Sequence, residues 1–110
     1  MSAAELKARL DRAGGEQEPL QVAPFLLDVR EPREFDYCRI EGSVLIPLGQ
    51  LAARAGELPD DRDIVAICHH GARSLQAAAF LQQARGLEVI NLQGGVAAWA
   101  DQVEPTMKRY

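Results

Sequence analysis

Residues 68–74 hold the side chains best suited to chemistry in this 110-residue sequence, Cys-His-His-Gly-Ala-Arg-Ser. They follow the apolar run at residues 64–67, whose composition is typical of a buried strand, and they precede a helical pattern that Gly86 ends. The backbone amides of such a loop can converge on one point, and the N-terminus of the helix adds positive potential there. Both effects favour the thiolate of Cys68 and attract anions. The segment therefore predicts a reactive cysteine in an anion-binding loop.

Alternating strand and helix patterns are expected to position this loop. Apolar runs predict strands at residues 25–29, 44–46, 64–67 and 88–92, with a further short strand at 20–22. Helical patterns cover residues 3–12, 32–35, 48–58 and 75–85, and a last short helix carries Trp99. The connections between strands are long enough for crossovers. One α/β domain over residues 1–110 follows, with a parallel sheet of four to five strands, helices on both faces, a core at about 3–100 and a short tail at 101–110.

In open parallel sheets, ligands bind beyond the carboxyl ends of the strands. Cys68 lies just past such an end, so the fold and the chemistry indicate the same place. Asp28 and Arg30 lie at the end of the 25–29 strand and can reach that place as well. We expect them to form a charged pair that braces the surrounding loops rather than to act on a substrate.

The composition narrows the classes of partner. Hydrophobic residues make up 47% of the chain and charged residues 25%, as in ordinary globular domains. The net charge of -4 argues against nucleic acid or an anionic membrane as a partner. The first residues lack the apolar segment of a signal peptide, and no apolar run approaches the roughly 18 residues of a transmembrane helix. Two cysteines do not make a disulfide framework. A cytoplasmic location is therefore expected, where Cys68 stays reduced.

Four segments, in order, resemble the single-domain rhodaneses, a family of sulfurtransferases. They are Leu-Leu-Asp-Val-Arg-Glu-Pro-Arg-Glu-Phe at 26–35, Ile-Glu-Gly-Ser-Val-Leu-Ile-Pro-Leu at 40–48, the loop at 68–74, and Leu-Gln-Gly-Gly-Val-Ala-Ala-Trp at 92–99. With the spacing between them, the resemblance covers about residues 3–99. It implies a single rhodanese-like domain that transfers a sulfane sulfur.

The resemblance implies a specific chemistry. In rhodaneses the loop cysteine, here Cys68, attacks the outer sulfur of an anionic donor such as thiosulfate, releases sulfite and becomes a persulfide. The sulfur then passes to a thiol, small or protein-borne, or to cyanide. Arg73 would offer a charge-assisted fork to a dianionic donor, and no cofactor is implied. The donor and the persulfide would also be held by the N–H groups of the loop, those of His69, His70, Gly71, Ala72, Arg73 and Ser74.

Loop length separates this resemblance from other enzymes that share the fold. Cell-cycle phosphatases and related arsenate reductases carry five residues between the cysteine and the arginine, whereas four separate Cys68 from Arg73. The shorter loop brings the amides closer to the sulfur. It therefore suits a sulfane sulfur better than a tetrahedral phosphate or arsenate.

The sequence also departs from many rhodaneses, since residues 38–40 are Cys-Arg-Ile where those proteins carry Gly-His-Ile. The doubled histidine and the tail at 103–110 resemble a narrower group. In that group the domain stands alone in bacteria or follows adenylating enzymes that activate ubiquitin-like sulfur carriers. The similarity implies sulfur delivery for biosynthesis. It leaves the acceptor open, and it leaves the donor open between thiosulfate and a persulfide, either of a cysteine desulfurase or of glutathione.

Plainer explanations account for several other residues. Cys38 is expected to be a packing residue, with a regulatory disulfide to Cys68 as the alternative. Gly94 and Gly95 are expected to allow close packing before the last helix, which Trp99 would anchor in the core.

The two histidines raise a separate question. A metal site is not expected, because adjacent histidines rarely aim at one ion and no ligand spacing is present. His69 and His70 are instead expected to line the rim of the loop. Whether either one transfers a proton to the acceptor stays open.

Three functions remain in competition. The first is a sulfurtransferase that works through a Cys68 persulfide. The second is a non-catalytic or sulfur-carrier module that binds a partner without turnover. Retention of Cys68, Arg73 and the glycine of the loop argues against the second, and the short loop disfavours the third, a small phosphatase or arsenate reductase. A Cys68→Ser variant separates the first two, because it abolishes sulfur transfer and leaves partner binding intact.

Overall fold

The computed structural model describes residues 1–13 and 23–110, which fold around a four-stranded sheet. The strands are β1 (Phe25–Asp28), β2 (Val44–Leu45), β3 (Ile64–Ile67) and β4 (Val89–Asn91), in the spatial order β2-β1-β3-β4. All three strand pairings are parallel. The predicted parallel sheet is confirmed with four strands, and the strand predicted at residues 20–22 lies outside the described residues.

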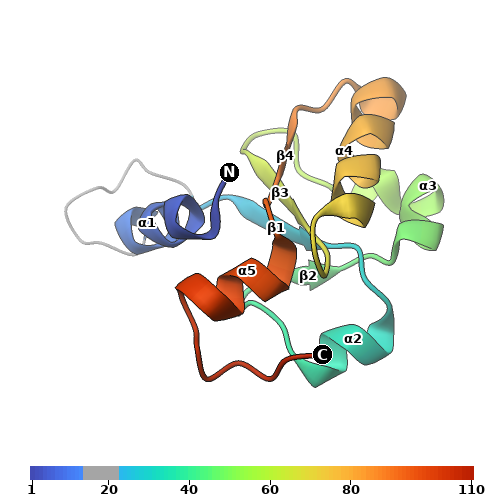
Figure 1. The fold of residues 1–110 in the computed structure, drawn as a ribbon. Coiled ribbons are helices and arrows are strands. Elements are labelled where there is room, and N and C mark those ends of the chain that lie inside the picture. Colours follow the sequence, from blue (N-terminus) through green and yellow to red (C-terminus); the bar gives the residue numbers. More distant parts are fainter. Residues whose placement is uncertain (14–22) are drawn as a thin grey trace.

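Helices cover both faces of the sheet, as Figure 1 shows. They are α1 (Ala3–Ala13), α2 (Pro32–Tyr37), α3 (Leu51–Arg54), α4 (Ala72–Arg85) and α5 (Gly95–Gln102). Successive strand residues point to opposite faces. Leu26 accordingly packs in the core formed with α1 and α5, and Leu27 in the core formed with α3 and α4. The predicted arrangement of helices on both faces is confirmed.

The prediction of one continuous helix at residues 48–58 is wrong. The segment consists of a 3₁₀ turn (Leu48–Gln50), the short helix α3 and a second 3₁₀ turn (Ala55–Glu57). Gly49 and Gly56 weaken a helix at these positions. The Arg85 guanidinium at the end of α4 also donates to the carbonyl oxygens of Ala55 and Leu58, at 2.7 and 3.2 Å. These two bonds join the last turn of the segment to the end of α4.

Other local predictions hold. The capping box at the start of α1 is present, since the side chains of Ser2 and Glu5 each accept the other residue's N–H at 3.1 Å. Gly86 ends α4, and Trp99 is buried in the core beneath α1. Among the described residues, no helix is both long enough and apolar enough to cross a membrane.

The carboxyl ends of three adjacent strands surround the start of α4. Asp28 ends β1, Cys68 directly follows β3 and Asn91 ends β4. Strand β3 lies between β1 and β4, and all run in the same direction. Three residues far apart in sequence therefore meet at one edge of the sheet, where this fold class places its ligands.

Candidate active site

The loop after β3 wraps around the sulfur of Cys68. This side chain is 1% exposed, and the N–H of Gly71 donates to its Sγ at 3.0 Å. The Ser74 hydroxyl oxygen lies 3.3 Å from the same sulfur. Gly71 has a φ of 111°, a conformation that side chains with a Cβ resist, and this turn lets α4 begin at Ala72 rather than at Leu75 as predicted. Arg73 and Ser74 consequently belong to the first turn of the helix.

Opposing effects set the pKa of Cys68. Burial would raise it, because desolvation disfavours the thiolate. The Ser74 hydroxyl and the backbone N–H groups of Ser74, Gly71 and Arg73 outweigh burial and hold the pKa of Cys68 below the ordinary thiol value of 9.0. Two of these N–H groups lie in the first helical turn, where backbone donors have no partner within the helix.

Asn91 holds the other side of this turn, and sequence reasoning missed it. Its Oδ1 accepts a hydrogen bond from the Ser74 hydroxyl at 2.5 Å, and its Nδ2 donates to the Gly71 carbonyl oxygen at 3.3 Å. The available signal was a polar residue at the carboxyl end of an apolar strand, the same signal that marked Asp28. Asn91 thereby ties β4 to the turn that opens α4.

Arg73 forms a two-pronged ion pair with Glu34 of α2, with N···O distances of 2.7 and 2.9 Å. Glu34 also accepts from the N–H of Glu31 and from the hydroxyl of Tyr110. Arg73 makes the largest contribution, and these hydrogen bonds together lower the pKa of Glu34 to about 2 against the effect of burial. Glu34 thus takes the fork that the resemblance assigned to a dianionic donor, so donor binding by Arg73 stays a prediction.

The expected charged pair at the end of β1 is present. Asp28 and Arg30 are both fully buried, with Arg30 Nη2 2.8 Å from Asp28 Oδ2. Arg30 also donates to the carbonyl oxygen of Cys38 at 2.7 Å and to the hydroxyl of Tyr110 at 2.9 Å. The guanidinium therefore joins β1, the end of α2 and the C-terminal tail.

His69 and His70 lie at the rim of the loop with stacked rings, whose centroids are 3.9 Å apart. The ring of Tyr110 also stacks on His69, at a centroid distance of 3.9 Å. Burial lowers the pKa of His69, and so does the neighbouring His70, which favours the neutral imidazole. The tail thus returns to the loop at residues 68–74, and no sequence signal marked Tyr110 for this contact.

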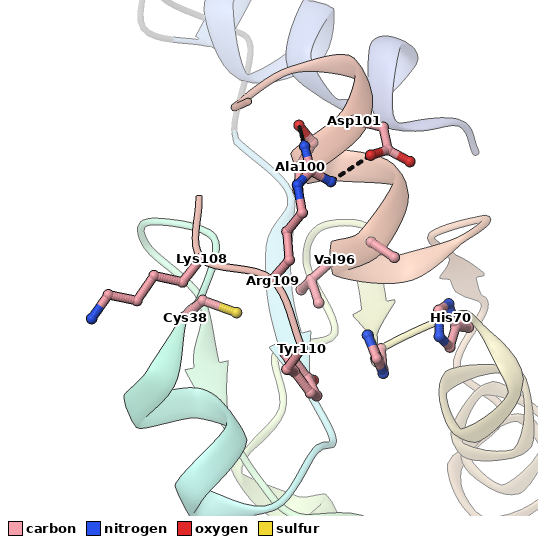
Figure 2. A pocket seen from close by; sticks show the side chains of 10 residues that line it. Cys38, His70, Val96, Ala100, Asp101, Lys108, Arg109 and Tyr110 are labelled. Carbon is pink, nitrogen blue, oxygen red and sulfur yellow. Dashed lines mark hydrogen bonds and ion pairs between the residues drawn. The ribbon is translucent and has the colours of Figure 1, made fainter. Parts of the chain in front are cut away.

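A pocket of about 140 Å³ opens beside the two histidines (Figure 2). Arg109 and Asp101, which form an ion pair, both line it. Its volume equals that of about four to five water molecules, enough for a small group to enter. The loop, α5, the tail and the end of α2 supply its lining residues, Cys38, His69, His70, Val96, Ala97, Ala100, Asp101, Lys108, Arg109 and Tyr110.

The first turn of α5 fixes the backbone of the loop from the opposite side. The N–H groups of Val96 and Ala97 donate to the carbonyl oxygens of Cys68 and His69, at 2.9 and 3.1 Å. A Cβ on Gly95 would lie 2.2 Å from the Cys68 carbonyl oxygen. The close packing predicted for the glycine pair is therefore confirmed.

Cys38 is buried in the core at the end of α2, which confirms it as a packing residue. The guanidinium of Arg30 lies next to it, with Nη1 3.9 Å from the Cys38 sulfur. Both Cys38 and Cys68 are free thiols in this structure. Over residues 1–13 and 23–110, no three metal-ligating side chains cluster around one point.

The known proteins that this chain resembles in sequence include proteins named as sulfurtransferases. The chain is 41% identical over 87 residues to the probable adenylyltransferase/sulfurtransferase MoeZ of Mycobacterium tuberculosis, a match that covers 77% of this chain and 22% of MoeZ. It is 43% identical over 76 residues to a sulfurtransferase of Allochromatium vinosum, covering 69% of this chain and 71% of that protein. The chain thus spans about a fifth of the length of MoeZ and most of the second relative.

The fold and the family agree with these relatives. The crystal structure of a rhodanese-related protein from Thermoplasma volcanium matches with a TM-score of 0.79 at 32% identity, covering 96% of this chain and 93% of that one. Residues 2–102 match the family of rhodanese-like domains. With a cysteine loop at the end of β3 and a family match over nearly its whole length, the chain belongs to the family of rhodanese-like domains.

Proposed function

We propose that this domain is a sulfurtransferase that carries a sulfane sulfur on Cys68 as a persulfide. The supporting observation is the surroundings of the sulfur, which meets the Gly71 N–H at 3.0 Å at the start of a 14-residue helix. Such donors stabilise negative charge on sulfur, and both the thiolate and the persulfide anion carry that charge. The names of both curated relatives include sulfur transfer, which supports the same reaction.

The reaction proceeds in two displacements on one nucleophile. The Cys68 thiolate attacks the outer sulfur of the donor, forming a new S–S bond, while the donor's own bond to that sulfur breaks. With thiosulfate as donor, the bonding electron pair leaves on sulfite. The acceptor then attacks the outer sulfur of the persulfide, and the electron pair of the S–S bond returns to Cys68 as thiolate.

We propose a small anionic donor of the thiosulfate type and a thiol acceptor, free or carried by a protein. The chain has a net charge of -4, so an anion is attracted by the local amide donors and not by the whole-molecule field. The pocket beside His69 and His70 gives an acceptor a place next to the loop. The rings of the two histidines would shape access to it.

A single-turnover experiment tests this function. The protein is incubated with thiosulfate, separated from it by desalting, and mixed with cyanide or a thiol. Wild-type protein and Cys38→Ser are expected to transfer close to one sulfur per chain, and Cys68→Ser none. Transfer by Cys68→Ser would contradict the mechanism. A parallel incubation uses a persulfide donor in place of thiosulfate. If only the persulfide donor loads Cys68, and the protein does not turn over thiosulfate, the domain would be a sulfur carrier instead.

A further inference from the structure

The hydroxyl group of Ser74 lies between two acceptors but has one proton to donate. Its oxygen lies 3.3 Å from Sγ of Cys68 and 2.5 Å from Oδ1 of Asn91. Ser74 itself is fully buried, so bulk water does not reach its hydroxyl group as a third partner. The direction in which this one proton points decides whether the Cys68 sulfur faces a hydrogen-bond donor or a hydrogen-bond acceptor.

The orientation of the Asn91 amide settles that direction. Its Nδ2 donates to the carbonyl oxygen of Gly71 at 3.3 Å. Turning the amide over would set Oδ1 against that carbonyl, two acceptors facing one another, so the hydrogen-bond network assigns Oδ1 to the side of Ser74. The Ser74 hydroxyl consequently donates to Asn91. In that arrangement the Cys68 thiol is the donor in its contact with the Ser74 oxygen.

We propose that Asn91 is a positioning residue that holds the Ser74 proton away from Cys68 and so keeps Cys68 protonated to a higher pH than the loop would otherwise allow. The inference rests on the proposed role of Cys68 as the nucleophile. The hydrogen bonds then run from the Cys68 thiol to Ser74, from Ser74 to Asn91, and from Asn91 to Gly71.

Ionisation of the Cys68 thiol reverses the direction of the hydrogen bond between Cys68 and Ser74. The thiol proton leaves to solvent water, and the Ser74 hydroxyl rotates to donate to the thiolate. Oδ1 of Asn91 gives up its donor at that moment, while Nδ2 keeps its bond to Gly71. The N–H of Gly71 faces the sulfur in both states, so the backbone donors stay in place.

The charged and titratable groups on the elements packed around the loop must stay unchanged in any test of this equilibrium. Within the described residues, none of these groups forms a hydrogen bond with the side chain of Ser74 or Asn91. The Met1 ammonium donates to the backbone carbonyl oxygen of Asn91 at 3.1 Å. The remaining groups come from the loop, α4, β1, α2 and the tail: His69, His70, Arg73, Asp28, Arg30, Glu34 and Tyr110.

The pH dependence of Cys68 alkylation by iodoacetamide tests the proposal, with the modified Cys68 peptide measured by mass spectrometry. Asn91→Val removes the acceptor and keeps a shape suited to a strand. The midpoint of alkylation is expected to fall by roughly one pH unit, because the Ser74 proton becomes free to stabilise the thiolate. A purely structural role for Asn91 predicts the opposite, since a loosened loop would move its amides from the sulfur and raise the midpoint.

The Ser74→Ala background supplies the control. Ser74→Ala alone is expected to raise the midpoint, and adding Asn91→Val to it should change nothing further. A midpoint that is unchanged or raised in Asn91→Val, or an equal fall without Ser74, would overturn the proposal. If circular dichroism shows that Asn91→Val is unfolded, Asn91→Ala replaces it. That variant also removes the acceptor and should lower the midpoint, and an unchanged or raised midpoint would overturn the proposal.

This test needs no sulfur donor. Absence of sulfur transfer in the wild type would therefore reject the proposed function and leave the alkylation result interpretable.

Discussion

Two buried cysteines lie in this fold, and their sulfurs meet different partners. Cys68, 1% exposed, meets the N–H of Gly71 at 3.0 Å and the Ser74 oxygen at 3.3 Å. Cys38, 9% exposed, has a guanidinium nitrogen of Arg30 at 3.9 Å and otherwise belongs to the apolar core. A nearby positive charge therefore does not distinguish Cys68, the proposed nucleophile, from the buried Cys38.

The difference lies in which donors are already committed. The Arg30 guanidinium is bound by Asp28, by the carbonyl oxygen of Cys38 and by Tyr110. The N–H groups at the start of α4 have no helical acceptor, so they are available to a sulfur anion. Oriented backbone donors, rather than net charge, make the Cys68 environment suited to sulfur chemistry.

Substitution of each cysteine in turn gives the largest expected contrast. Cys68→Ser is expected to abolish sulfur transfer, because the nucleophile is lost. Cys38→Ser should change the rate by no more than about two- to threefold, since the Cys38 sulfur packs in the core beside Arg30 and does not carry the transferred sulfur. Rates of sulfur transfer from thiosulfate to cyanide measure both effects. A comparable loss in the two variants, with wild-type circular dichroism, would remove the distinction.

The cation beside Cys38 is expected to stabilise the fold. Arg30→Met leaves Asp28 buried without its partner, which should cost about 3–5 kcal/mol of unfolding free energy. Urea unfolding measures this cost. Arg54→Met is the matched control, because its pair with Glu57 is exposed and screened by solvent, so its loss should change the unfolding free energy little. Equal losses in the two variants would show that Arg30 does not brace the site.

Glu34 connects Arg73 near Cys68 to the tail, and its effect should depend on pH. Its pKa is lowered from 4.5 to about 2, so the stability it contributes is complete above pH 4.5 and is lost as the pH falls through about 2. The difference in Tm between wild type and Glu34→Gln should therefore shrink as the pH falls from 4.5 to about 2. The same scan on Glu57→Gln, at an exposed pair, provides the comparison. A difference independent of pH would contradict the assignment.

Tyr110 contacts residues near each of the two cysteines, and its substitution should have the smallest effect of the four. Its ring stacks on His69, and its hydroxyl joins Arg30 to Glu34. Tyr110→Phe keeps the ring and should leave the ring-current shift of the His69 protons in place, whereas Tyr110→Leu should remove it. Proton NMR of the His69 imidazole measures this shift. Equal spectra for the two variants would show that the stack does not form in solution.

The sequence predicted the parts of this site that depend on local pattern. Continuous apolar runs in β1 and β3 are typical of strands buried on both faces, so the position of Cys68 at a strand end followed. The continuous helix predicted at 48–58 is divided into three short turns, the last of which is bound by Arg85 from far along the chain, at the carbonyl groups of Ala55 and Leu58. Local patterning contains no information on such a contact.

The residues that surround the loop were harder to predict for the same reason. Glu34, Asn91 and Tyr110 reach it from α2, β4 and the tail, and their partners are distant in sequence. Glu34 carried a weak signal as the third helical residue of a capping box, and Asn91 one as a polar strand end. Tyr110 became visible only once tertiary packing brought the tail to His69.

The most direct test of the central claim is to map the sulfur itself. Wild-type protein is incubated with thiosulfate, its persulfides are trapped by alkylation, and the Cys68 and Cys38 peptides are compared by mass spectrometry with those from Cys68→Ser. The account predicts one added sulfur atom on the Cys68 peptide, removed by a thiol reductant, and none on the Cys38 peptide in either protein. Added sulfur on Cys38, or on any peptide of Cys68→Ser, would contradict it.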